Sequence, residues 1–77
     1  MKNVTIYTTP TCGWCRAAKD FFAQHNVTYT EKDVVVDEAA RAEMLQKSNQ
    51  LGVPVIDIDG DIVIGFNQPR LAELLEA

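Results

Sequence analysis

The only two cysteines of this 77-residue chain stand three positions apart, between a short apolar run and a helical pattern. Residues 4–7 are all β-branched or aromatic, which predicts a short buried strand. Residues 13–25 carry apolar side chains at helical spacing, which predicts a helix that begins at the cysteines. Cys12 would then be the N-cap of this helix and Cys15 would lie in its first turn. At this spacing the two sulfur atoms can come close enough to bond.

A helix N-terminus favours a thiolate at Cys12, because it presents unpaired N–H groups and a partial positive charge. A Cys-x-x-Cys pair between a strand and a helix in a small chain therefore indicates a redox site. Half of a zinc site, an inert structural disulfide or two unreactive thiols remain alternatives. Arg16 and Lys19 follow the cysteines closely and can make the site locally positive and tune the thiol ionisation. Alternatively, these two side chains only form part of a solvated helix face.

Length, charge and cysteine content narrow the classes of protein to which the chain can belong. Its 77 residues predict a single domain over residues 1–77, with a core of marginal size. A net charge of −4 argues against a nucleic-acid partner, and no apolar run approaches the roughly 20 residues of a membrane span. Two cysteines are too few for a disulfide-stapled secreted scaffold, and no signal-peptide pattern follows Met1. We therefore expect a cytoplasmic protein.

The middle of the chain predicts a second strand and a second helix. Residues 27–33 alternate in part, as a half-buried strand does. A strand–helix–strand unit of this length implies a right-handed crossover and a parallel pair of strands. Asp37 is a suitable N-cap for a helix over about residues 38–49, which are rich in helix-forming residues.

The last third of the chain predicts a hairpin followed by a helix. Residues 55–58 and 61–64 flank Asp59-Gly60, a pair that favours a two-residue type I′ turn. Asn67 can cap the last helix, in which Pro69 is tolerated in the first turn. The predicted order is βαβαββα. It implies an α/β fold with a four-stranded mixed sheet, a parallel half and an antiparallel hairpin, and helices on both faces.

Several short pieces, in this order, resemble those of a known family. They are Tyr7-Thr8, the stretch Cys12-Gly13-Trp14-Cys15, Ala18-Lys19, Val53-Pro54 and Gly65. With the order of elements, they resemble the thioredoxin fold and, more closely, the glutaredoxins and the glutaredoxin-like redoxins that reduce ribonucleotide reductase. The similarity extends over essentially the whole chain.

The resemblance implies a dithiol–disulfide oxidoreductase that reduces protein or small-molecule disulfides. Cys12 would be the nucleophile and Cys15 the resolving thiol. Val53-Pro54 resembles the family's cis-proline pair, beside which the Val53 backbone would bind a peptide or glutathione as an added strand. The residues expected to contact substrate are Thr11, Gly13, Trp14, Val53, Pro54, Gly65 and Phe66. We expect a monomer with no tightly bound cofactor and no metal.

Two departures from the family leave the electron source open. Glutaredoxins that use glutathione often carry a lysine where this chain has Thr9, and a pair of carboxylates where it has Asn67 and Gln68. Gly65-Phe66 looks more like the ribonucleotide-reductase redoxins, which accept electrons from thioredoxin reductase. Their usual dipeptide between the cysteines is not Gly-Trp. Either glutathione or thioredoxin reductase is therefore expected as reductant.

Two further functions remain alternatives. One is an iron–sulfur cluster or metal-binding module that bridges two protomers, because the two cysteines of one chain cannot supply four ligands. The other is a binding domain without catalysis that uses the groove beside Val53. Trp14 also has two interpretations: it shields the site or contacts a partner, or it caps the core.

Overall fold

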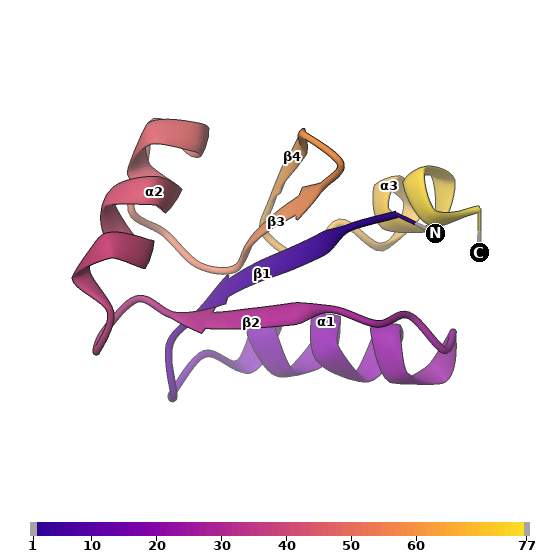
Figure 1. Cartoon of the computed structure of the whole chain (residues 1–77). Helices are drawn as coiled ribbons and strands as arrows, with labels where there is room; N and C mark the ends of the chain where they lie inside the picture. The colour runs from indigo at the N-terminus through magenta and orange to yellow at the C-terminus, as the bar shows by residue number, and fades with distance from the viewer. Residues whose placement is uncertain (1, 77) are drawn as a thin grey trace.

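The strands and helices follow one another in the order expected from the sequence (Figure 1). The structure is a computed structural model, and it describes residues 2–76. Its elements are β1 (Val4–Thr8), α1 (Gly13–Gln24), β2 (Thr30–Asp33), α2 (Glu38–Ser48), β3 (Val55–Ile58), β4 (Asp61–Ile64) and α3 (Gln68–Leu75). None of the helices in this part of the chain has the length and apolar character needed to cross a membrane.

The strands form one mixed sheet in the order β2-β1-β3-β4. β1 pairs with β2 in parallel and with β3 antiparallel, and β3 pairs with β4 antiparallel. The predicted parallel pair and the predicted hairpin are thus both confirmed. Between β3 and β4, Asp59 and Gly60 have φ angles of 51° and 95°. Positive φ at both central residues is what a type I′ turn requires.

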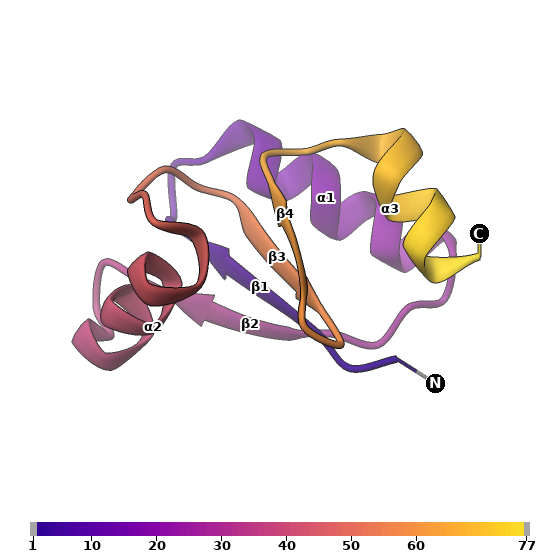
Figure 2. The ribbon, with the colours of Figure 1, turned by 90° about the horizontal axis from the view of Figure 1, so that it is seen from above.

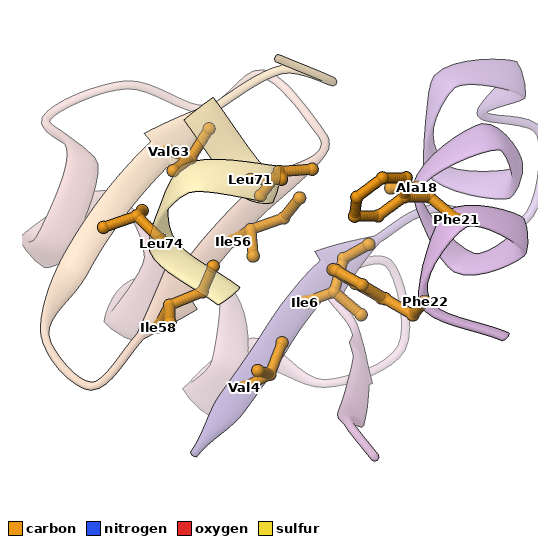
Figure 3. Close-up of a cluster of buried hydrophobic side chains, with 10 residues drawn as sticks. All are labelled: Val4, Ile6, Ala18, Phe21, Phe22, Ile56, Ile58, Val63, Leu71 and Leu74. Atoms are coloured by element: carbon orange, nitrogen blue, oxygen red, sulfur yellow. The ribbon is translucent and has the colours of Figure 1, made fainter. Parts of the chain in front are cut away.

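Helices cover both faces of the sheet, with α1 and α3 on one side and α2 on the other (Figure 2). Successive residues of a strand point to opposite faces, so Ile6 packs under α1 and α3 while Tyr7 packs under α2. Figure 3 shows the larger cluster, to which α1 contributes Ala18, Phe21 and Phe22 and α3 contributes Leu71 and Leu74. This cluster fixes α1, and with it both cysteines, against β1.

The sequence placed the start of the second strand too early. β2 begins at Thr30 rather than at residue 27, because its pairing with β1 starts at the partners Thr5 and Thr30. Residues 27–29 have no strand beside them, and Val27 and Tyr29 pack instead against the cluster under α1. The ends of two helices also differ by one residue: α1 ends at Gln24 and α2 at Ser48.

A network of polar side chains joins α2 to the face of the sheet that it covers, away from α1 and α3. The buried Tyr7 donates its hydroxyl hydrogen bond to Glu43, which also accepts from Lys32 at 2.9 Å. Lys47 donates to the Tyr7 hydroxyl at 2.9 Å and to Asp57 at 2.7 Å. The network satisfies the one polar atom of Tyr7 and ties α2 to β1, β2 and β3.

Glu43 should make the stability of the fold depend on pH. The hydrogen bond from Tyr7, followed by that from Lys32, lowers the pKa of Glu43 to about 2. Since the pKa is lower in the folded state than in the unfolded one, the carboxylate stabilises the fold above about pH 5. That contribution is lost as the pH falls through the folded value of about 2. We expect the free energy of unfolding, measured by urea denaturation, to fall over this range in the wild type and to fall less in Glu43→Gln.

The matched control is Asp20→Asn, at an exposed position of α1. It should keep the wild-type dependence on pH. If the free energy of unfolding of Glu43→Gln fell with pH as steeply as that of the wild type, the network would not couple Glu43 ionisation to folding.

Candidate active site

Cys12 occupies the N-cap of α1, as the sequence predicts. Its φ and ψ of −85° and 110° are extended, and its Sγ accepts a hydrogen bond from the backbone N–H of Cys15 at 3.1 Å. The loop that leads into the helix is closed by a bond from the Cys12 N–H to the carbonyl of Thr9, at 3.3 Å. The sulfur atom therefore sits where the first N–H groups of the helix point.

The two thiols are free and lie in different environments. Cys12 is half-buried and can be reached from solvent, whereas Cys15 is only 1% exposed. Burial, with the hydrogen bond to Cys12, raises the pKa of Cys15 to about 12, and a backbone hydrogen bond from Thr9 opposes the rise. The pair thus has one accessible sulfur atom and one covered sulfur atom that is protonated at neutral pH.

The loops that lead into β3 and out of β4 meet the cysteine loop at one end of the sheet. Tyr7 of β1 is opposite Val55 of β3, so the end of β1 lies beside the start of β3. The bond between Val53 and Pro54 is cis, as the resemblance predicts. The N–H of Gly65 donates to the carbonyl of Pro54 at 2.8 Å. The sheet register thus carries the cis-proline pair and Gly65 to the end at which the cysteine loop begins.

Trp14 lies on the surface beside Phe66. It is 66% exposed, and its ring centroid lies 6.2 Å from that of Phe66. Phe66 in turn packs edge to face on Phe21 of the core, with the two ring centroids 6.1 Å apart. Gly65 has a φ of 80°, which glycine adopts readily, and this turn directs Phe66 back toward α1. Trp14 therefore extends an aromatic surface next to the cysteines and does not cap the core.

The two cations after the cysteines differ in their contacts. Lys19 forms an ion pair with Glu31 of β2 at 3.0 Å, and this contact raises the pKa of Lys19. Arg16 is exposed, and within residues 2–76 it forms no ion pair. Thr11 and Gly13 are also exposed, and a Cβ at Gly13 would meet no atom within 4 Å. Of these four residues, Lys19 alone belongs to a polar network.

Two residues near the cysteines have contacts that the sequence did not reveal. Thr8 is buried, and its hydroxyl donates to the Glu31 carboxylate at 2.8 Å. Glu31 is opposite Ile6 in the parallel register, so its side chain points to the α1 face of the sheet. Residues 30–33 are all polar, so the sequence carries no apolar alternation that would indicate this face.

The single histidine and the hairpin carboxylates lie away from the cysteines. His25 is at the opposite end of α1, where its ring packs on Phe21 with centroids 4.4 Å apart. Asp57 accepts a bond from the N–H of Gly60 within the hairpin, and Asp59 accepts one from the N–H of Asn3, the residue before β1. Across residues 2–76, no three His, Cys, Asp or Glu side chains come together as metal ligands.

Comparisons with known proteins identify the family of the chain. The family model described as Glutaredoxin matches residues 4–63. An uncharacterised glutaredoxin-like 8.6 kDa protein in the rubredoxin operon of Clostridium pasteurianum is 42% identical over 73 residues, which cover 95% of this chain and 97% of that protein. Glutaredoxin 3 of Escherichia coli K12 is 37% identical over 65 residues, which cover 84% of this chain and 78% of that protein. The crystal structure of a mutant of the thioredoxin-like protein BC3987 superposes with a TM-score of 0.91 at 38% identity, covering 99% of this chain and 97% of that one. The chain therefore belongs to the glutaredoxin family, whose members are thiol–disulfide oxidoreductases with the thioredoxin fold.

Proposed function

We propose that the chain is a dithiol–disulfide oxidoreductase that reduces disulfides through Cys12 and Cys15. The observation that carries the proposal is the asymmetry of the two thiols. Cys12 is accessible and accepts a hydrogen bond from the first turn of α1, whereas Cys15 is buried directly behind it. The Cys12 Sγ faces the first N–H groups of α1, and the thiolate is the attacking form of a cysteine in thiol–disulfide exchange.

The reaction proceeds in two exchanges. The Cys12 thiolate attacks one sulfur of the substrate disulfide, and the other substrate sulfur leaves as a thiolate and takes up a proton. Cys15 then loses its proton and attacks the Cys12 sulfur, so that the Cys12–Cys15 disulfide forms and the second substrate thiol is released. Two electrons pass from the chain to the substrate, and an external reductant restores the dithiol.

The substrate would bind in an extended conformation across the end of the sheet. Within residues 2–76, the backbone N–H and C=O of Val53 form no hydrogen bond, so both can pair with an added strand. Pro54 has no N–H to compete for the thiolate. Trp14 and Phe66 would contact apolar groups of the substrate, and Thr11, Gly13 and Gly65 would line its path.

Glutathione and thioredoxin reductase are the two candidate reductants. Glutaredoxins use glutathione, and a buckwheat glutaredoxin of the same fold, 23% identical with a TM-score of 0.79, was crystallised as a glutathione complex. Here residues 65–68 carry no carboxylate to hold the glutathione amino group. Asn67 instead caps α3 by accepting the N–H of Arg70 at 3.3 Å.

We propose that the chain acts as a monomeric single domain in the cytoplasm, with no tightly bound cofactor.

An NADPH-coupled assay tests the function and distinguishes the reductants. One arm contains thioredoxin reductase, and the other contains glutathione with glutathione reductase. Insulin serves as the protein disulfide in both. We expect catalysed NADPH oxidation in at least one arm, and we expect the thioredoxin reductase arm to be the faster because Thr9, Asn67 and Gln68 replace charged glutathione contacts. Turnover no faster than without the chain in both arms would contradict the proposal.

The geometry gives less support to a cluster shared by two protomers. Cys15 is buried, so only Cys12 of each protomer can reach a cluster between them, and two glutathione thiolates would have to supply the other ligands. The same missing carboxylates weaken glutathione binding.

A further inference from the structure

A short polar network lies one helical turn away from Cys15. Lys19 of α1 places its Nζ 3.0 Å from Oε2 of Glu31 on β2. The hydroxyl of Thr8 on β1 donates to the same oxygen at 2.8 Å. Thr8 is 2% exposed, whereas the Lys19 and Glu31 side chains are 29% and 39% exposed. Three elements therefore converge on one carboxylate.

The network is adjacent to Cys15 for reasons of backbone geometry. Residues four apart lie on the same face of a helix, and long helical side chains lean toward the helix N-terminus. Lys19 therefore leans toward Cys15. Glu31 is opposite Ile6 in the sheet and shares its face, the face under α1. The ion pair thus lies between α1 and the sheet, on the side of the buried thiol.

The charges of this pair act on Cys15 in opposite directions. The Lys19 ammonium favours the ionised thiol, although burial has the larger effect and keeps the pKa of Cys15 high. The contact with Lys19, followed by that with Thr8, lowers the pKa of Glu31. Both members of the pair are therefore charged near neutral pH. Besides its ion-pair partner and Cys15, the other titratable group that acts on Lys19 is Tyr29, and Cys12 acts on Cys15 itself.

We propose that Glu31 is a positioning residue that neutralises Lys19 and thereby limits the ionisation of the resolving thiol Cys15. The inference rests on the proposed redox function and adds a residue to it. A neutral Cys15 leaves Cys12 as the single nucleophile toward substrate. In the second exchange Cys15 gives up its proton, its sulfur bonds to Cys12, and the substrate sulfur leaves with the electron pair and takes up a proton.

The two members of the pair should have opposite effects on this second exchange. Glu31→Gln leaves Lys19 uncompensated, which favours the Cys15 thiolate. Lys19→Met leaves Glu31 uncompensated, which disfavours it. A tenfold change in the acid dissociation constant of Cys15 changes the rate of attack about three- to fourfold, because a less basic thiolate is also a weaker nucleophile. We expect a change of this size, faster for Glu31→Gln and slower for Lys19→Met.

Rapid mixing of the reduced full chain with a chromogenic aromatic disulfide separates the two exchanges. The first aromatic thiolate is released by Cys12 at a rate proportional to the reagent concentration. The second is released by Cys15 at a rate independent of that concentration. We expect the single variants to move the second phase in opposite directions, the double variant Lys19→Met/Glu31→Gln to return it close to the wild-type rate, and all to keep the first phase.

Lys32→Met is the matched control, because Lys32 forms a similar ion pair with Glu43 on the α2 face of the sheet. It should leave both phases unchanged. Shifts of the second phase in the same direction for both single variants, or no shift in either, would overturn the role of Glu31. A wild-type chain that releases no aromatic thiolate would instead contradict the proposed function itself.

Discussion

Cys12→Ser is expected to abolish disulfide reduction, with a fall in turnover on the order of 10³-fold or more. Cys12 is the accessible thiol at the N-cap of α1, and its sulfur receives the N–H of Cys15 at 3.1 Å. A serine hydroxyl can accept the same bond, but it does not ionise at neutral pH and is a poor nucleophile toward sulfur. The coupled insulin assay measures the loss.

The fold should survive this substitution, because serine is an effective N-cap residue. Thermal unfolding of the variant close to that of the wild type would show that the loss is chemical. The second control is Cys15→Ser, which keeps the nucleophile and should therefore still release the first substrate sulfur, whereas Cys12→Ser should release none. Wild-type turnover by Cys12→Ser would exclude Cys12 as the attacking sulfur and overturn its assignment as the nucleophile.

The order of the elements could be predicted because local signals were strong. Asp59-Gly60 between two β-rich runs specifies a hairpin, and both residues adopt the positive φ that its turn requires. Asp37 and Asn67 cap α2 and α3 as expected, since each side chain accepts a backbone N–H three residues later. Such interactions span a few residues, so a single sequence contains them in full.

The start of β2 could not be predicted, because strand pairing is not a local property. Val27 and Tyr29 alternate as a strand would, yet the pairing with β1 begins at Thr30. Their apolar side chains pack under α1 instead. A pattern of two apolar residues shows which face is buried, but it does not show whether a partner strand is present.

The cysteine pair could be found in the sequence, whereas most of its surroundings could not. The burial of Cys15 depends on how α1 packs on the sheet. Trp14 meets Phe66, which is far away in the sequence. Lys19 meets Glu31 only because β1 and β2 are parallel in one register. The cis bond before Pro54 was expected from the family resemblance alone, since the local sequence also permits a trans bond.

Cys15→Ser is expected to stop the reaction at the mixed disulfide. The first exchange needs only the Cys12 thiolate, so one substrate sulfur should still leave. The second exchange needs a thiol behind Cys12, and Cys15 is the only other cysteine of the chain. With a disulfide-containing protein, a covalent adduct should accumulate to about one per chain, visible as a mass increase that dithiothreitol removes.

The trapped adduct separates the two roles more sharply than activity does. Cys12→Ser and the double variant Cys12→Ser/Cys15→Ser should form no adduct, although both should keep the fold and the net charge of the wild type. An adduct on Cys12→Ser would mean that Cys15, despite its 1% exposure, can reach substrate. Cys15→Ser that forms no adduct but turns over with glutathione would mean that an external thiol resolves Cys12 faster than Cys15 does. In that case the chain would work through one cysteine, and the buried thiol would serve only the packing of α1.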